Sequence, residues 1–168
     1  MENLDIARNH LLVPTGLSDE DINKALSEAL GGSIDAADLY FQSTTRESWS
    51  LDDGIVKDAS FNLEHGVGVR AMSGDKTLLE SSRAARSIAK SPGANDMQSW
   101  RVQTGHTLYT PDNPLSVLNE NEKMDLLRTA DTVAREADPR VKQVMVSLVG
   151  THEVILIARS DGTLAADV

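Results

Sequence analysis

The sequence predicts an α+β fold in which an antiparallel β-meander with hairpins packs against about four helices. Apolar and polar side chains alternate from Ala59 to Glu64 and again from Val67 to Met72, which is the period of a half-buried strand. Turn-forming residues bound this stretch at Asp52-Asp53-Gly54 and at Ser73-Gly74-Asp75-Lys76. Helix-period segments flank the meander on both sides, so helices and strands are expected to pack into one core.

Four helices follow from their end signals and apolar stripes. The first covers Leu4 to Val13 and ends at Pro14-Thr15-Gly16, and the third covers Leu79 to Lys90. The second begins at Ser18, which can form a capping box with Asp21, and continues to Leu30. The fourth follows an Asn119 and Glu122 cap and ends at Asp138-Pro139. Its expected buried face consists of Met124, Leu127, Ala130, Ala134 and Ala137.

Further strands are expected on either side of the meander. Ala37 to Leu51 precedes it, and Trp100 to Tyr109 follows the third helix. A hairpin of Val141 to Val149 and Thr151 to Arg159 follows the fourth helix, and a turn at Ser160-Asp161-Gly162 leads into a last strand. That strand stops at Val168 with no polar tail, so we expect the chain to be a fragment of a longer protein.

Length and composition suit one globular domain. A chain of 168 residues with 40% apolar and 25% charged content can bury a core of its own. The formal net charge of -10, with scattered Lys and Arg, argues against direct nucleic-acid binding. The absence of Cys excludes disulfides, thiolate catalysis and Cys-ligated zinc. No signal peptide or apolar run of about 20 residues is present, so we expect a cytoplasmic protein without membrane contact.

The motifs that could carry chemistry are each better explained structurally. Gly66-Val67-Gly68-Val69-Arg70-Ala71 fits a loose dinucleotide fingerprint, but strand alternation continues after it where a helix is needed, which favours a bend or bulge in a strand. His152-Glu153 begins a zincin motif without its second His, and neighbouring side chains on a strand face opposite ways. His10, His65 and His106 stand alone in sequence, so each is expected to be a surface or hydrogen-bonded residue, and a site assembled in space from several of them is the alternative.

Acidic pairs and serines give no better site. Asp52-Asp53 lies in a turn, and Asp19-Glu20-Asp21 lies in a helix first turn, where carboxylates favour the helix dipole. Ser73 lacks the flanking glycines of a nucleophile elbow, and the few aromatic residues are too dispersed to stack bases. We therefore assign no catalytic, cofactor-binding or metal-ligating residue to this chain.

Several motifs together resemble the amino-terminal domain of the TldD/PmbA family. They cover nearly the whole chain and are closer to the TldD branch than to the PmbA branch, which is also called TldE. At Thr77-Leu78 the sequence lacks a strand and loop that members of this family contain. The matching segments are Asp38-Leu39-Tyr40-Phe41-Gln42, Glu47-Ser48-Trp49, Leu51 to Asp58, Gly66 to Ala71, Ser73 to Thr77, Lys123 to Leu127, Val133 to Asp138 and Asp161 to Val168.

The resemblance implies a function that the residues alone do not. Members of the family have been labelled modulators of DNA gyrase and are understood as zinc metalloproteases. The zinc site, an H-E-x-x-x-H motif with a later Cys, would lie in a carboxy-terminal catalytic domain that is absent here. Residues 1–168 would then form a single amino-terminal domain, divisible into sub-lobes 1–110 and 119–168.

By the same resemblance, the chain would carry no catalytic site of its own. It would help to form a TldD/TldE heterodimer and a chamber in which unfolded peptides are cleaved. The alternative is a non-enzymatic interaction module, in which an acidic domain contacts a partner such as DNA gyrase. A nucleotide-binding domain that rests on the Gly66 motif is a weaker third interpretation.

Overall fold

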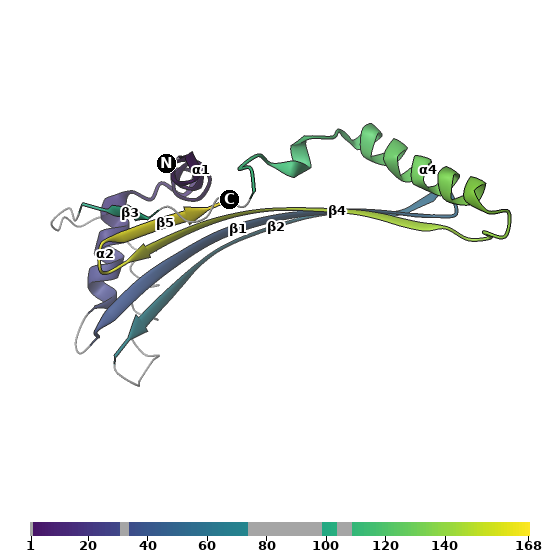
Figure 1. Cartoon of the computed structure of the whole chain (residues 1–168). Coiled ribbons are helices and arrows are strands. Elements are labelled where there is room, and N and C mark those ends of the chain that lie inside the picture. The colour runs from purple at the N-terminus through teal and green to yellow at the C-terminus, as the bar shows by residue number, and fades with distance from the viewer. Residues whose placement is uncertain (1, 31–33, 74–98, 104–108) are drawn as a thin grey trace. The chain divides into compact units, whose positions relative to one another are not determined.

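A computed structural model describes residues 2–30, 34–73, 99–103 and 109–168. Among them five strands form one sheet in the order β2-β1-β4-β5-β3, and the chain also forms helices (Figure 1). This mixed arrangement confirms the predicted α+β class. The strands are β1 (Ala36–Asp52), β2 (Ile55–Met72), β3 (Arg101–Gln103), β4 (Met145–Arg159) and β5 (Thr163–Asp167).

The helical elements match three of the four predictions. The predicted first helix is divided into α1 (Glu2–Ala7), a π-helical turn η1 (Arg8–Leu12) and a 3-10 turn η2 (Val13–Thr15). It ends at Gly16, whose φ of 71° lies in the left-handed region that closes many helices. The remaining elements are α2 (Asp19–Ala29), η3 (Pro114–Ser116) and α4 (Glu120–Ala137). The predicted helix at 79–90 and the Thr77-Leu78 junction lie outside the described residues.

Both predicted capping boxes are present. The Asp21 backbone N–H donates to Ser18 Oγ at 3.3 Å, and the Ser18 N–H donates to Asp21 Oδ2 at 2.9 Å. Asn119 and Glu122 repeat this exchange at the start of α4. Each box satisfies backbone donors that the first helical turn leaves without intrahelical acceptors. The two helices therefore begin where the sequence indicates.

One predicted strand break is wrong, because the expected hairpin at Gly150 is one strand, β4. The alternating segments on either side of Gly66 belong to one strand, β2. A Cβ built on Gly150 would come within 2.5 Å of Leu115 Cδ2, so this glycine leaves room for the turn before α4 and makes no chain reversal. By contrast, the Asp53-Gly54 turn is confirmed, because both residues have the positive φ of a type I′ hairpin (50° and 74°).

The chain divides into two compact units, which we call the first and second units. The first comprises Met1–Ser43, His65–Pro111 and Glu153–Val168. The second comprises Thr44–Glu64 and Asp112–His152. Strands β1, β2 and β4 contribute residues to both, and within the first unit β5 pairs antiparallel with β4 and parallel with β3.

The main hydrophobic core lies in the first unit. The apolar side of α2 packs with α1, η1 and the buried positions of β1, β4 and β5. On β4 the even-numbered Val154, Leu156 and Ala158 are fully buried, as strand alternation requires. The buried members are Leu4, Ala7, Leu11, Leu12, Ile22, Ala25, Leu26, Ala29, Ala37, Leu39, Phe41, Val154, Leu156, Ala158 and Leu164.

Candidate functional site

The glycines of the dinucleotide-like motif lie inside β2 and form no loop. Neither Gly66 nor Gly68 has a positive φ. A Cβ added to Gly66 would meet nothing within 4 Å, and one added to Gly68 would make only ordinary contact with Tyr40 at 3.9 Å. A phosphate-binding turn needs a helix amino terminus directly after the glycines, and the chain here remains extended to Met72. This geometry rules out the Gly66 motif as a nucleotide fingerprint.

The His152-Glu153 pair lies on β4, as predicted. The His152 side chain is buried, whereas Glu153 is exposed and accepts a hydrogen bond from Gln42 Nε2. Successive side chains of a strand point to opposite faces, so these two do not converge on one ion. The pair therefore acts as part of the strand and not as the start of a zinc motif.

In the first unit, the fold brings together two histidines that are distant in sequence. His10 Nε2 lies 3.1 Å from the Oγ of buried Ser43, and the His10 ring centre is 6.1 Å from that of His65. These residues come from η1, β1 and β2. His106 lies outside the described residues. Within the described ranges, no group of three or more His, Cys, Asp or Glu residues could hold a metal ion.

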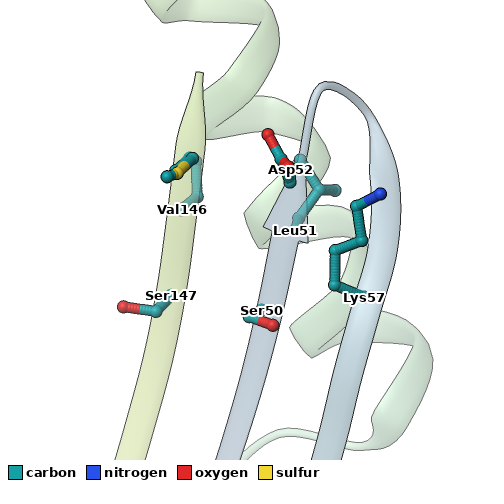
Figure 2. A pocket seen from close by; sticks show the side chains of 7 residues that line it. Ser50, Leu51, Asp52, Lys57, Val146 and Ser147 are labelled. Atoms are coloured by element: carbon teal, nitrogen blue, oxygen red, sulfur yellow. The ribbon is translucent and has the colours of Figure 1, made fainter. Parts of the chain in front are cut away.

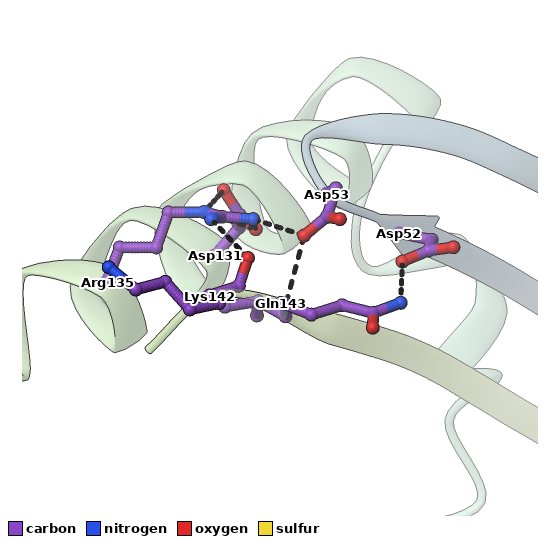
Figure 3. A network of polar contacts seen from close by, with 7 residues as sticks. Asp52, Asp53, Asp131, Arg135, Lys142 and Gln143 are labelled. Carbon is purple, nitrogen blue, oxygen red and sulfur yellow. Dashed lines mark hydrogen bonds and ion pairs between the residues drawn. The ribbon is translucent and has the colours of Figure 1, made fainter. Parts of the chain in front are cut away.

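In the second unit, the acidic pair at the β1–β2 turn joins a polar network (Figure 3). Arg135 Nη2 donates to Asp53 Oδ1 at 2.5 Å, and Arg135 Nε donates to Asp131 Oδ2 at 3.1 Å. Asp53 also accepts the Val144 backbone N–H at 3.1 Å. This backbone bond, and then Arg135, lower the pKa of Asp53 below its ordinary range. The network fixes the hairpin turn against α4 and β4, so the acids have a structural role.

A second polar cluster is nearly enclosed. Lys123 Nζ donates to both carboxylate oxygens of Glu47 at 2.8 Å and to the Leu115 carbonyl at 3.0 Å, which uses all three ammonium protons. Trp49 Nε1 also donates to Glu47. The Lys123 and Glu47 side chains are only 10% and 12% exposed. The sequence does not predict this pair, because Lys123 is charged and is not one of the apolar residues expected to form the buried face of the helix.

A shallow hollow of about 320 Å³ lies across three strands of the second unit (Figure 2). It contains one carboxylate and one ammonium group, Asp52 and Lys57, and Asp52 accepts a hydrogen bond from Gln143 at 3.1 Å. None of its lining residues is a histidine that could serve as a base. Its serine hydroxyls, carboxylate and ammonium group can form polar contacts with a ligand. Its lining residues are Ser50, Leu51, Asp52, Lys57, Met145, Val146 and Ser147.

The second unit also exposes many large apolar side chains. Among its described residues only three apolar ones are buried, Leu51, Leu127 and Val144. Extended exposed apolar surface on a soluble protein usually marks an interaction site. Nine large apolar side chains are exposed there: Ile55, Val56, Phe61, Leu63, Val117, Leu126, Val133, Met145 and Val149.

Within the described ranges, no helix has both the length and the apolar content needed to cross a membrane. The longest, α4, has 18 residues and is amphipathic.

Two models of one protein family match this chain. The model for PmbA/TldA metallopeptidase domain 1 matches residues 37–90, and that for the PmbA/TldA metallopeptidase central domain matches residues 113–168. Together they cover well over half of the chain. Between them they leave residues 91–112 unmatched.

Curated relatives align along almost the full chain. A metalloprotease TldD homologue of Haemophilus influenzae is 38% identical over 98% of this chain, and one of Buchnera aphidicola subsp. Acyrthosiphon pisum is 35% identical over 98%. These alignments cover 37% and 36% of the relatives, so the chain spans little more than a third of their length.

Solved structures share the fold. A candidate modulator of a DNA gyrase from Thermotoga maritima matches 89% of this chain and 36% of its own, with a TM-score of 0.62 and 15% identity. TldE from Thermococcus kodakarensis matches 87% of this chain and 37% of its own, with a TM-score of 0.56 and 12% identity. With both family models and near-complete alignment to TldD homologues, the chain belongs to the PmbA/TldD metallopeptidase family.

Proposed function

We propose that this chain is the non-catalytic amino-terminal part of a TldD-type zinc metallopeptidase subunit, acting in the cytoplasm. The observation that carries the proposal is the alignment of 98% of the chain with only 37% of a metalloprotease TldD homologue. The remaining length of such a protein can hold the catalytic machinery. In this proposal residues 1–168 act as one amino-terminal domain that supplies framework and contact surface.

The chemistry of the side chains supports placing catalysis elsewhere. Zinc in a metallopeptidase needs three protein ligands and an open position for water. The described histidines do not combine with carboxylates into such a set: His10 lies near His65, and His152 lies on a strand in the other unit. We therefore place the zinc ligands in the part of the relatives that this chain does not span.

The same proposal gives the second unit a role in assembly. We infer that the chain helps to form a TldD/TldE heterodimer whose chamber admits unfolded peptides. The exposed apolar side chains of the second unit support this inference, because burying them against a partner removes them from water. The similarity of the fold to a solved TldE is consistent with two subunits of related structure.

Zinc content and peptide hydrolysis test the assignment. We expect the 168-residue chain to hydrolyse no unfolded peptide and to retain less than one zinc per chain after dialysis, as measured by elemental analysis. The complete protein with its TldE-type partner should hydrolyse unfolded peptides and retain zinc after dialysis. A chelator should abolish its peptide hydrolysis. Zinc-dependent cleavage by the 168-residue chain alone would overturn the proposal.

A second candidate function is a protein-interaction module that modulates DNA gyrase. The net charge of -10 favours it, because an acidic surface can contact a basic DNA-binding surface. Such a complex would weaken strongly as salt rises. Capture of gyrase by the chain at low salt and its release at high salt would support this function, and no capture at low salt would exclude it.

A further inference from the structure

Strand β2 is uncovered over its whole length in the second unit. Every residue from Ile55 to Glu64 is exposed. The strand order places β2 at one end of the sheet, next to β1 alone. Its outer side therefore presents a row of backbone N–H and C=O groups that no described strand pairs.

Edge strands are commonly protected against pairing with other chains by shortness, proline or charged side chains. Strand β2 has 18 residues and no proline, and its segment from Ala59 to Leu63 carries no charge. A long edge without such protection is expected where pairing is part of the function.

The side chains show which face a partner would cover. Ser48 Oγ lies 2.7 Å from Ser60 Oγ, so these two share a face, and the neighbouring Phe61 lies on the opposite one. Glu47, the neighbour of Ser48, faces α4 through its bond to Lys123. Phe61 thus lies on the α4 side of the sheet but remains 67% exposed.

These features together favour an added strand over other partners. A helix laid on the face of β2 could cover Phe61 and Leu63, which is 49% exposed, but would leave the backbone edge unpaired. A strand beside β2 pairs the backbone and also places its own side chains next to both residues. The partner chemistry is therefore an extended segment with apolar side chains at alternate positions.

We propose that β2 from Ile55 to Glu64 pairs antiparallel with the equivalent edge strand of a partner subunit of the same family. This inference rests on the proposed function. A solved TldE shares this fold over 87% of the chain, so a TldE-type partner would carry an equivalent edge strand. Two equivalent edges can pair about a pseudo-two-fold axis. A second copy is less favourable, because each copy carries a net charge of -10 and like charges repel.

Amide hydrogen exchange tests the pairing directly. The chain is measured alone and with an equimolar TldE-type partner, and sedimentation establishes complex formation independently. We expect outward amides of Ile55–Glu64 to exchange at least tenfold more slowly in the complex. A complex without this protection would overturn the pairing but leave the heterodimer intact. If no complex forms, both the strand pairing and the proposed heterodimer are overturned. Concentration-dependent protection of the chain alone would instead identify a second copy as the occupant.

A pair of matched variants gives a second test. Phe61→Lys puts a charge on the proposed interface, and because the side chain is exposed in the chain alone, the fold and thermal midpoint should be unchanged. We expect partner affinity to fall at least tenfold. Thr132→Lys alters an exposed polar residue on α4 in the same unit, outside the nine exposed apolar side chains, and should change affinity less than twofold. Equal affinities for the two variants would overturn the proposal.

Discussion

At the scale of single residues, the Lys123 and Glu47 pair is the most consequential polar contact in the second unit. Both side chains are about nine-tenths buried, and the ammonium has three acceptors. Removing one partner leaves the other charge desolvated and unpaired.

We expect Lys123→Met to lower the free energy of unfolding by about 2 kcal/mol or more in urea titrations. Arg128→Met, which breaks an exposed pair with Asp125, should cost at most about 0.5 kcal/mol. Equal losses of unfolding free energy in the two variants would show that the buried pair is worth no more than the exposed one.

The same pair predicts a pH signature. Burial alone would raise the pKa of Glu47, but the hydrogen bonds from Lys123 and Trp49 and the Lys123 charge outweigh it and hold the pKa below the ordinary value of 4.5. The resulting stabilisation is present above the unfolded-state pKa and is lost as pH falls through the folded-state pKa. In Lys123→Met, burial is uncompensated, so protonating Glu47 relieves the penalty. The stability difference between wild type and variant should therefore shrink from pH 6 toward pH 4, as followed by denaturant midpoints. A constant difference would show that Glu47 is not the affected group.

At the scale of elements, α4 shows where a pattern of apolar residues misleads. Its position and both ends are predicted correctly, but the buried stripe is Lys123, Leu127 and Asp131. The predicted face included Ala130 and Ala137, which are exposed. An alanine gains little by burial, whereas paired charges can be buried when each has a partner. In the sequence this stripe is indicated only by the four-residue spacing of Lys123, Leu127, Asp131 and Arg135.

The hairpin turn between β1 and β2 yields a prediction that separates two kinds of glycine. Gly54 has a φ of 74°, where a Cβ costs about 1 to 2 kcal/mol even though nothing lies within 4 Å. Gly66 lies in open space within a strand, without positive φ. We expect Gly54→Ala to lower the thermal midpoint clearly and Gly66→Ala to leave it unchanged or slightly raised. A large loss in Gly66→Ala would mean that the glycine makes a contact beyond strand geometry.

The strands also show the limits of local sequence. The Asp53-Gly54 turn was predictable because both residues tolerate positive φ, and the Ser160-Asp161-Gly162 turn likewise has Gly162 at 81°. The prediction of a turn at Gly150 is wrong because a glycine is needed there to leave room for the Leu115 side chain, and Leu115 is 35 positions away in sequence. The Glu47 contact with Lys123 and the His10 contact with Ser43 are equally non-local. A single sequence carries no record of such pairs, whereas caps and hairpin turns are set by neighbouring residues.

At the scale of the whole molecule, the two units differ in what stabilises them. The first buries a continuous cluster that includes Leu39, Leu156 and Leu164, each at most 1% exposed. The described part of the second buries Leu51, Leu127 and Val144 and depends on the Glu47 and Asp53 ion pairs. Free energies of local opening follow the amount of buried apolar contact. A small apolar core supplemented by ion pairs is consistent with the proposal that a partner subunit covers the remaining apolar surface of this unit.

This difference predicts sub-global unfolding in the isolated chain. We expect amides of β2 from Ile55 to Glu64 and of α4 to exchange through openings of lower free energy than those at Val154, Leu156 and Ala158. As urea is raised below the main unfolding transition, the amides of the second unit should come to exchange through one common opening. The amides of the first unit should stay protected. Lys123→Met should lower only the second-unit opening energy, because the pair lies entirely within that unit. If all slow amides instead share one opening energy and respond equally to the variant, the chain unfolds as a single cooperative block, and the second unit would need no partner to complete its stability.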